Sequence, residues 1–207
     1  MIHSPFHVVE NFISPLQCEH LVQQLGLKAP NTNEFGQAKH ERLLPPLEAG
    51  PLLGELDALS PLLEKRYGGS LAATPNLLFQ QYWENPKLPA EPHWAEGWDF
   101  KRKKWNKIKD INLVGFIWLK DYHDAVPLDP RFEVYGGKLE FPAYNFSLVP
   151  VRGTLIMYPA TPHFVTAMSH VMLGSLEQIK VTMKLSGFDY SPAKFPGSYQ
   201  EWFTQEE

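Results

Sequence analysis

Two of the eight histidines, His93 and His163, differ from the others in their surroundings. Each directly follows a proline, and each stands at the start or the end of an apolar segment with β-strand character. A mononuclear non-haem iron site usually takes two imidazoles and a carboxylate on one face of the metal, which leaves the other positions open for a keto acid and O₂. His93 and His163 are therefore candidate metal ligands, although a lone histidine has many other uses on a surface or in a core.

The segments that must position these histidines begin with a short strand and a helix. Ser14 and Pro15 have the residue types of a helix N-cap and first helical position, and the apolar face that follows ends at Gly26. Residues 27–51 are rich in Pro, Asn and Gly, so we expect a loop there. A second helix is predicted over 52–67, directly before two glycines.

From residue 75 onward, short apolar segments alternate with turn residues. Eight of them have strand character: LLFQQYW, INLVGFIWL, RFEVY, KLEF, FSLV, GTLIMY, HFVTAM and QIKVTMKL. Eight short strands after two helices predict a mainly β fold with flanking helices, a double-stranded β-helix of the cupin-like jelly-roll type. We expect one domain over 1–207, with an N-terminal strand and buttressing helices in 1–74, the β-helix core in 75–190 and a tail in 191–207.

Composition and charge argue against several classes of protein. The formal net charge of -4 disfavours a dedicated nucleic-acid binder, although residues 101–104 form a local basic run. No apolar run approaches the roughly 20 residues of a membrane-spanning helix. Cys18 is the single cysteine, so an internal disulfide cannot form and a reducing compartment is the simplest interpretation. We expect a cytoplasmic protein whose partners include neither a membrane nor a nucleic-acid polymer.

The order of several motifs resembles the prolyl-hydroxylase-like branch of the Fe(II)/2-oxoglutarate-dependent oxygenases. A strand with Tyr82 is followed by His93, a strand ending in WLKDY, and then YGGKLEF, VPVRGTLIMYP and PHFVTA. The N-terminal VVENFISPLQCEHLV also resembles the strand and helix with which that branch begins. The resemblance covers nearly the whole chain, with 27–51 the least matched part. It implies an enzyme that uses Fe(II), 2-oxoglutarate and O₂.

The resemblance also implies the metal ligands. His93 matches the proximal ligand of the family and His163 the distal one. His170 remains a rival to His163, because it lies ten residues before Lys180, a separation that is common in this branch. We prefer His163, because Tyr158, Pro159 and Pro162 form the turn that the family has before its distal histidine.

The co-substrate has two candidate binding residues. Its far carboxylate needs a buried cation, because an unpaired buried charge costs several kcal/mol. Lys180 matches that cation, and Lys184 is the alternative, because the two-residue period of a strand places it on the same face. Tyr82 resembles a tyrosine that donates a hydrogen bond to the same co-substrate, and an ordinary core aromatic is the alternative.

The third metal ligand of the family is missing from this sequence. Hydroxylases of the family carry His-x-Asp or His-x-Glu, because alternate residues on a strand face the same side. Here Ala95 stands at that position. The pattern His-x-Ala resembles the iron-dependent halogenases, in which chloride takes the place of the carboxylate. The resemblance therefore favours a halogenase whose catalytic centre contains His93, Ala95 and His163, with chloride as a further ligand.

Two other interpretations of Ala95 stay open. In the first, Glu96 or Asp99 bends back through a bulge at Gly97 and completes the triad of an ordinary hydroxylase. In the second, the iron site is lost and the domain only binds a ligand or a partner.

Two loops are candidates for contacting the substrate, which can be a small molecule or a peptide. The segment GWDFKRKKWNKIKD brings Trp98 and Trp105 together with several cations, which suits an anionic or amphipathic substrate, although a solvated hairpin edge has the same composition. On the opposite rim, HDAVPLDPRFEVY offers Asp124, Asp129 and Glu133 for a substrate amine.

Overall fold

The computed structural model describes residues 4–26, 39–83, 96–99, 104–107, 111–142, 145–161, 164 and 166–188. At Lys39 and in strands β5 and β6 it describes the backbone alone. The helices are α1 (Pro15–Leu25) and α2 (Pro46–Tyr67). The strands are β1 (His7–Val9), β2 (Lys39–Leu43), β3 (Ser70–Leu71), β4 (Asn76–Trp83), β5 (Glu96–Asp99), β6 (Lys104–Lys107), β7 (Leu113–Trp118), β8 (Asp121–His123), β9 (Glu133–Gly136), β10 (Leu139–Phe141), β11 (Phe146–Leu148), β12 (Leu155–Pro159), β13 (Ala167–Met168), β14 (Val171–Leu173), β15 (Ser175–Met183) and β16 (Leu185–Ser186).

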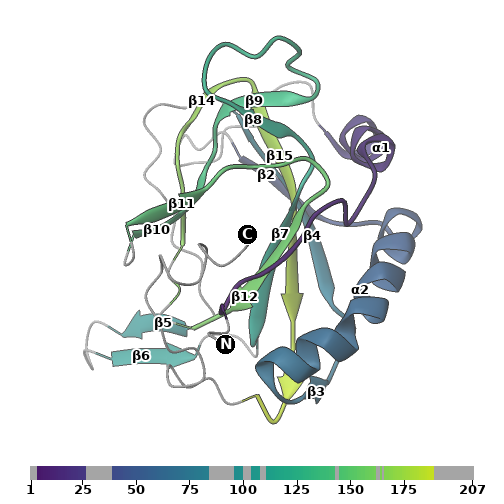
Figure 1. The fold of residues 1–207 in the computed structure, drawn as a ribbon, viewed down its shortest axis with the longest axis vertical. Coiled ribbons are helices and arrows are strands. Elements are labelled where there is room, and N and C mark those ends of the chain that lie inside the picture. Colours follow the sequence, from purple (N-terminus) through teal and green to yellow (C-terminus); the bar gives the residue numbers. More distant parts are fainter. Residues whose placement is uncertain are drawn as a thin grey trace.

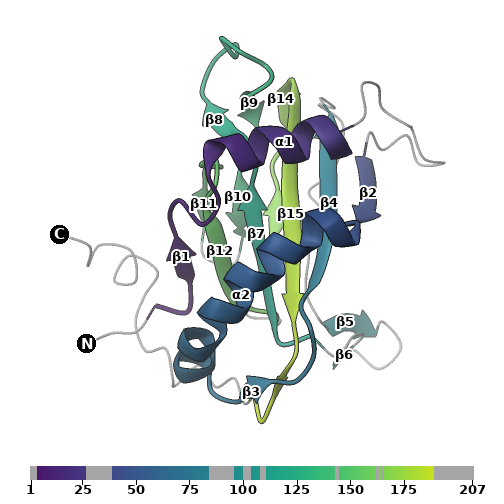
Figure 2. The same ribbon diagram turned by 90° about the vertical axis from the view of Figure 1, so that its right-hand side faces the viewer.

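A six-stranded antiparallel sheet forms the main wall of the molecule (Figure 1), in the order β1-β12-β7-β15-β4-β2. Two three-stranded sheets, β11-β10-β13 and β14-β9-β8, lie against one face of it. Helices α1 and α2 cross the other face (Figure 2). The predicted fold class is confirmed: the chain is a mainly β jelly roll with flanking helices.

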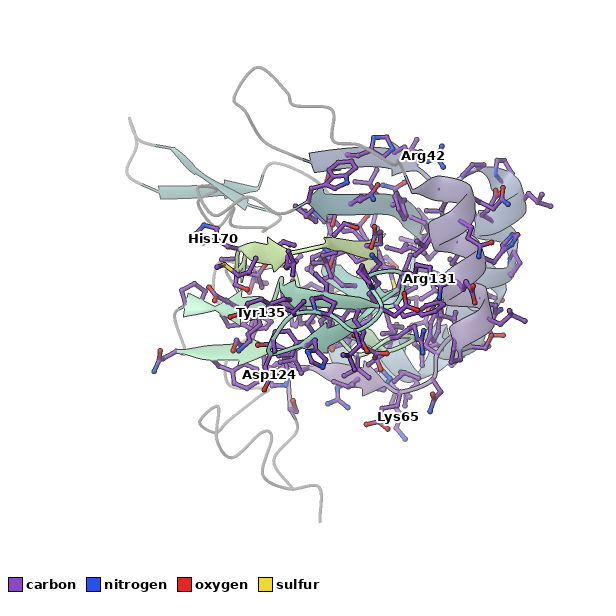
Figure 3. All side chains as sticks on the ribbon, turned by 90° about the horizontal axis from the view of Figure 1, so that it is seen from above. Arg42, Lys65, Asp124, Arg131, Tyr135 and His170 are labelled. Carbon is purple, nitrogen blue, oxygen red and sulfur yellow. The ribbon has the colours of Figure 1, made fainter. Side chains whose placement is uncertain are left out.

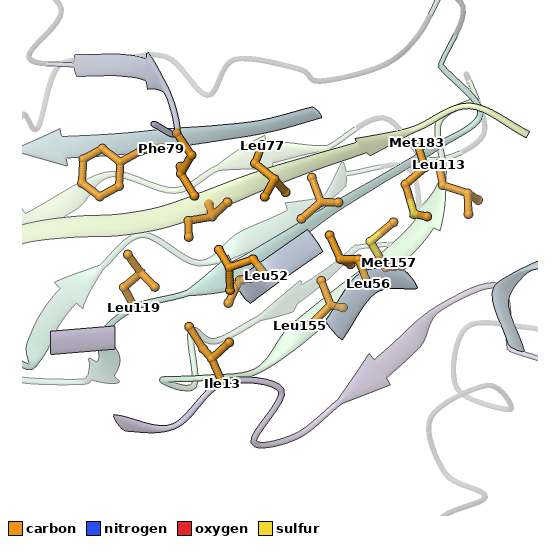
Figure 4. Packing of buried hydrophobic residues seen from close by; sticks show 14 of the residues in the cluster. Ile13, Leu52, Leu56, Leu77, Phe79, Leu113, Leu119, Leu155, Met157 and Met183 are labelled. Carbon is orange, nitrogen blue, oxygen red and sulfur yellow. The ribbon is translucent and has the colours of Figure 1, made fainter. Parts of the chain in front are cut away.

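Side-chain alternation gives the main sheet two different apolar faces. On the helix side, residues such as Leu77, Phe79 and Leu155 share one buried cluster with Leu52 and Leu56 of α2 (Figure 4). On the other face, a second cluster fills the jelly-roll interior between the main sheet and the two smaller sheets. Burial on both faces explains why β7 reads as a continuous apolar segment.

The start of α1 is as predicted. The hydroxyl of Ser14 accepts a hydrogen bond from the backbone N–H of Gln17 (3.2 Å), and the Gln17 side chain accepts one from the backbone N–H of Ser14 (2.8 Å). This reciprocal pair is a capping box, with Pro15 at the first helical position. Helix α1 ends at Leu25, before Gly26, and Cys18 is fully buried beneath it.

The loop predicted over 27–51 is wrong in its second half. Strand β2 lies within it and pairs with β4, and α2 begins at Pro46, six residues before the predicted start. The sequence of β2, KHERL, has little apolar pattern, because an edge strand is fixed by backbone pairing rather than by burial. Helix α2 continues through Pro51, where a break is expected from sequence. Neither α1 nor α2 is long and apolar enough to cross a membrane.

Two further expectations are corrected. Of the strand predicted over 163–168, the described part is the two-residue strand β13 at Ala167–Met168, and the backbone N–H of Phe164 donates instead to Thr161 O (2.9 Å). The segment after residue 95 was expected to be a loop, but it contains the antiparallel pair β5–β6. Short polar strands of this kind carry too weak a signal to be told from loops.

The Gly136–Gly137 pair explains the YGGKLEF motif. Both residues have positive φ, at 93° and 73°. A Cβ on Gly136 would lie 2.1 Å from His170 O, and one on Gly137 would lie 2.9 Å from the Leu176 side chain. The pair therefore lets the turn between β9 and β10 approach β14 and β15 closely.

Candidate functional site

Lys180 lies in the middle of β15, on the face of the main sheet that lines the jelly-roll interior. Its register partners are Phe116 on β7 and Leu78 on β4, and Phe116 belongs to the interior cluster. The Lys180 side chain is half-buried. Lys184, in contrast, follows the end of β15 and is exposed. The placement favours Lys180 over Lys184 as an interior cation.

Tyr82 lies on the same interior face, on the neighbouring strand β4. It stands opposite Leu176, and its side chain is 8% exposed. Tyr82 is four residues along β4 from Leu78, the partner of Lys180, which corresponds to about 13 Å of strand. The two predicted co-substrate residues therefore share a wall of the interior, but another row of side chains separates them.

That row consists of polar side chains from four neighbouring strands. Gln178 of β15 stands opposite Gln80 of β4 and Trp118 of β7, and Gln80 stands opposite Glu41 of β2. Gln178 Nε2 donates to Gln80 Oε1 (2.9 Å), and Gln80 Nε2 donates to Glu41 Oε1. Gln80 and Gln178 are both 0% exposed. We call these four residues the interior row.

The inner end of the interior row has two buried polar atoms without a hydrogen-bond partner among the described residues. They are the indole Nε1 of Trp118 and Oε1 of Gln178. Most buried polar groups are satisfied, so such a pair beside a half-buried lysine marks a candidate ligand position. Sequence reasoning missed both residues. The sequence does contain a signal for this row: Gln80 lies in one apolar strand, and Gln178 and Lys180 lie two residues apart in another.

An aromatic cluster fills another part of the interior. The ring of Phe6 lies 4.9 Å from that of Phe141 and 5.5 Å from that of Phe164, and Phe141 lies 5.2 Å from Tyr158. Burial raises the pKa of Tyr158 well above its usual range, and the hydroxyl donates to Thr166 Oγ1 (3.4 Å). The cluster therefore carries no charge at neutral pH and excludes water from this side of the interior.

His93, Ala95 and His163, the predicted catalytic centre, lie outside the described residues. Within the described parts of the chain, no three His, Cys, Asp or Glu side chains come together as a group that could hold a metal ion. The rival His170 is described. It precedes β14, is exposed, and lies at the end of the molecule away from the helices (Figure 3).

Trp98 and Trp105, the predicted substrate residues, stand opposite each other in the β5–β6 pair. The register is regular from Glu96 opposite Lys107 to Asp99 opposite Lys104. The backbone thus brings the two tryptophan positions together, as the sequence pattern indicated, whereas the bulge needed to redirect Glu96 or Asp99 does not occur within β5.

The acidic rim predicted to hold a substrate amine is used largely by its own loop. Asp129 forms two hydrogen bonds with the Arg131 guanidinium (2.9 and 2.7 Å), which hold the pKa of Asp129 at about 2. Glu133 Oε2 accepts from the backbone N–H groups of Leu128 (2.7 Å) and Asp129 (3.2 Å). Of the three carboxylates, Asp124 alone is exposed and has no such contact among the described residues, so this rim is mainly a structured loop.

A buried ion pair joins this loop to the helix-side face of the main sheet. Lys120 Nζ lies 2.9 Å from Glu177 Oε2 and donates to Pro130 O (2.8 Å). Gln81 Nε2 and the Ser175 hydroxyl both donate to Glu177 Oε1 (2.8 and 2.7 Å). Burial raises the pKa of Glu177 despite these contacts. The pair faces away from the jelly-roll interior, so it supports the wall and does not line the site.

Lys180 and Trp118 have the donor groups that could hold a carboxylate. An ammonium and an indole N–H on one interior wall supply the charged and the neutral donor that a carboxylate accepts. The apolar residues around them would strengthen that interaction by excluding water.

Comparison with known proteins supports the fold. No family model matches the chain, and no curated protein does. Several solved structures share its architecture. The viral collagen prolyl hydroxylase of Paramecium bursaria Chlorella virus-1, in its 2-oxoglutarate complex, aligns over 87% of this chain and 95% of its own, with a TM-score of 0.61 and 13% identity.

Two further structures are similar. A prolyl-4-hydroxylase from Pseudomonas putida aligns over 89% of this chain and 94% of its own, with a TM-score of 0.59 and 12% identity. HygX from Streptomyces hygroscopicus, with nickel and 2-oxoglutarate bound, aligns over 94% of this chain and 91% of its own, with a TM-score of 0.53 and 11% identity. At these identities the likeness concerns the fold alone.

Proposed function

We propose that this chain is an Fe(II)/2-oxoglutarate-dependent enzyme that functionalises a C–H bond of a small-molecule or peptide substrate. The observation that carries the proposal is Lys180, a half-buried cation on the interior wall of the jelly roll, with the unpartnered indole N–H of Trp118 nearby in the register. A half-buried cation on an apolar wall suits an anionic ligand. The structures of similar fold that contain 2-oxoglutarate are in keeping with a keto-acid dianion.

In this proposal His93 and His163 hold the iron, and Lys180 binds the far carboxylate of 2-oxoglutarate. Trp118 donates a second hydrogen bond to that carboxylate, and Tyr82 one to the same co-substrate. Fe(II) with 2-oxoglutarate and O₂ supplies oxidative attack on an unactivated C–H bond. The aromatic cluster around Phe141 keeps water away from the bound co-substrate.

Halogenation is the reaction that Ala95 favours. An alanine methyl group cannot bind a metal. The coordination position that a carboxylate two residues after His93 would fill is therefore left for a small anion. Chloride there keeps the charge balance that a carboxylate gives in a hydroxylase. Trp98 and Trp105, paired in the β5–β6 register, are the proposed substrate contacts.

Hydroxylation is the second candidate, and the fold comparisons favour it. The two prolyl hydroxylases similar to this chain are named for that reaction, and another similar structure, from Trichoplax adhaerens, is a prolyl hydroxylase in complex with a peptide (TM-score 0.52, 11% identity). Glu96 or Asp99 would then have to provide the carboxylate, and the regular β5–β6 register, which has no bulge, counts against that role.

The co-substrate part of the proposal is tested by anaerobic titration of the protein with Fe(II) and 2-oxoglutarate. We expect the absorption band of a ferrous 2-oxoglutarate complex. If the band does not form, the domain does not bind Fe(II) together with 2-oxoglutarate, and the enzymatic proposal is wrong.

The reaction type is tested on Ala95. Chloride should shift the ferrous absorption band of the wild-type protein, because it becomes a metal ligand. Ala95→Asp should abolish that shift by filling the position with a carboxylate, and Ala95→Gly is the matched control that should keep it. A wild-type band that does not respond to chloride would contradict halogenation and leave hydroxylation as the reaction.

A further inference from the structure

The interior row connects an exposed carboxylate at the sheet edge with the wall that carries Lys180. Glu41 on β2 is exposed, whereas Gln80, Gln178 and Trp118 are at most 2% exposed. The four residues stand opposite one another on adjacent strands, so their side chains point to the same face. The hydrogen bonds run without a gap from Glu41 through Gln80 to Gln178.

The chemistry of Glu41 determines the direction of these hydrogen bonds. An ionised carboxylate only accepts, so Gln80 must turn its amide NH₂ toward Glu41 and its carbonyl oxygen toward Gln178. Gln178 must then turn its own NH₂ toward Gln80, and its carbonyl oxygen is left at the inner end. A glutamine side chain alone has no such preference, because its two ends are nearly equal in shape.

The free carbonyl oxygen of Gln178 lies on the same strand face as Lys180, two residues away. That oxygen is the negative end of the amide dipole, and a hydrogen-bond acceptor near an ammonium favours its charged form. If the row ran in the opposite direction, the NH₂ group of Gln178 would occupy this place. The row would then offer Lys180 a second donor in place of an acceptor, which disfavours the charged ammonium.

We propose that Glu41 is a positioning residue for the co-substrate site: acting through Gln80 and Gln178, it keeps a carbonyl oxygen beside Lys180. Glu41 itself touches no ligand. Its effect on co-substrate binding rests on the proposed function, whereas its effect on the direction of the glutamines does not. A group on the edge strand β2 thus sets the orientation of an amide on β15, two strands further into the sheet.

The direction of the row is tested without any ligand, by NMR of the glutamine side-chain amides in Glu41→Gln. A glutamine at position 41 can donate or accept, so both directions become available. We expect the Gln178 amide signals, assigned with Gln178→Leu, to shift or double. Glu41→Asp keeps an acceptor-only group and should retain the wild-type pattern. Unchanged Gln178 signals in Glu41→Gln would overturn the proposal.

The consequence for binding is tested by the anaerobic 2-oxoglutarate titration of the same variants. Glu41→Gln should raise the Kd for 2-oxoglutarate about 5- to 10-fold, which corresponds to about 1.0–1.4 kcal/mol at RT ≈ 0.59 kcal/mol, with the unfolding midpoint unchanged. Glu41→Asp should restore most of the affinity. Glu140→Gln removes a charge from β10, whose flanking Leu139 and Phe141 face the interior, and is the matched control that should leave Kd unchanged.

The outcomes separate the two proposals. A Kd in Glu41→Gln that is unchanged or lower than that of the wild type overturns the positioning role. A wild-type protein that binds no 2-oxoglutarate overturns the proposed function, and the amide signals still report whether Glu41 directs the row.

Discussion

Lys180 is the residue on which the proposed co-substrate site depends most directly. Replacing it with methionine keeps the length of the side chain and removes the charge. A charge-assisted hydrogen bond contributes about 1.5–3 kcal/mol, so we expect Lys180→Met to raise the Kd for 2-oxoglutarate by roughly 10- to 100-fold in the anaerobic titration. Lys184→Met is the matched control, because Lys184 is exposed beyond the end of β15, and its Kd should equal that of the wild type. Equal losses in both variants would remove Lys180 from the site.

Cys18 gives a second test at the residue scale. Its side chain is 0% exposed, and burial raises the pKa of the thiol to about 12. The thiolate is the reactive form, so the folded protein should react with iodoacetamide far more slowly than the unfolded chain. Because Cys18 is the only cysteine, mass spectrometry reads the reaction as a single adduct. Rapid labelling under native conditions would show that α1 does not protect this residue.

At the scale of elements, the capping box of α1 has a measurable share in stability. Ser14→Ala removes the acceptor of the Gln17 backbone N–H, and losing an N-cap of this type costs about 1 kcal/mol. We expect the free energy of unfolding, measured in denaturant, to fall by that amount. Gln24→Ala, at an exposed position of the same helix, is the control and should change it by a few tenths of a kcal/mol at most.

The two smaller sheets and the main sheet serve different purposes. The main sheet provides the wall with Lys180, Tyr82 and the interior row, and its helix-side face is stabilised by α1 and α2. The smaller sheets contribute mainly apolar residues such as Val134 and Leu139 to the interior. Polar chemistry is thus concentrated on the better supported wall, as a site that must hold its geometry requires.

At the scale of the whole molecule, His7 links stability to pH. Burial and the nearby Arg66 lower the pKa of His7 from 6.5 to about 4. The folded state therefore binds fewer protons than the unfolded state between these values. The free energy of unfolding therefore has its full His7 contribution above pH 6.5 and loses it as the pH falls toward 4. Between pH 7 and pH 4, the midpoint temperature of thermal unfolding should fall less in His7→Gln than in the wild type. An equal fall of the midpoint temperature in both proteins would show that His7 does not link stability to pH.

Much of the fold follows from the sequence because local patterns report it directly. Ser14 and Pro15 mark a helix start, and the alternation in QIKVTMKL marks a strand with Lys180 on one face. These signals depend on neighbouring residues alone, so they remain valid in the folded chain. The jelly-roll class follows in the same way from many short strands after two helices.

Other features were decided only by the tertiary structure. Strand β2 exists because β4 offers it an unpaired edge, and α2 runs through Pro51 because Leu52 and Leu56 are buried against the sheet. The interior row depends on register between β2, β4, β15 and β7, whose residues are separated by up to 137 positions in sequence, from Glu41 to Gln178 (178 minus 41). The sequence by itself determined that Lys180 lies on a strand with an inward face. Only the pairing of distant strands placed Gln80, Gln178 and Trp118 beside it, because register is set by long-range packing and not by local pattern.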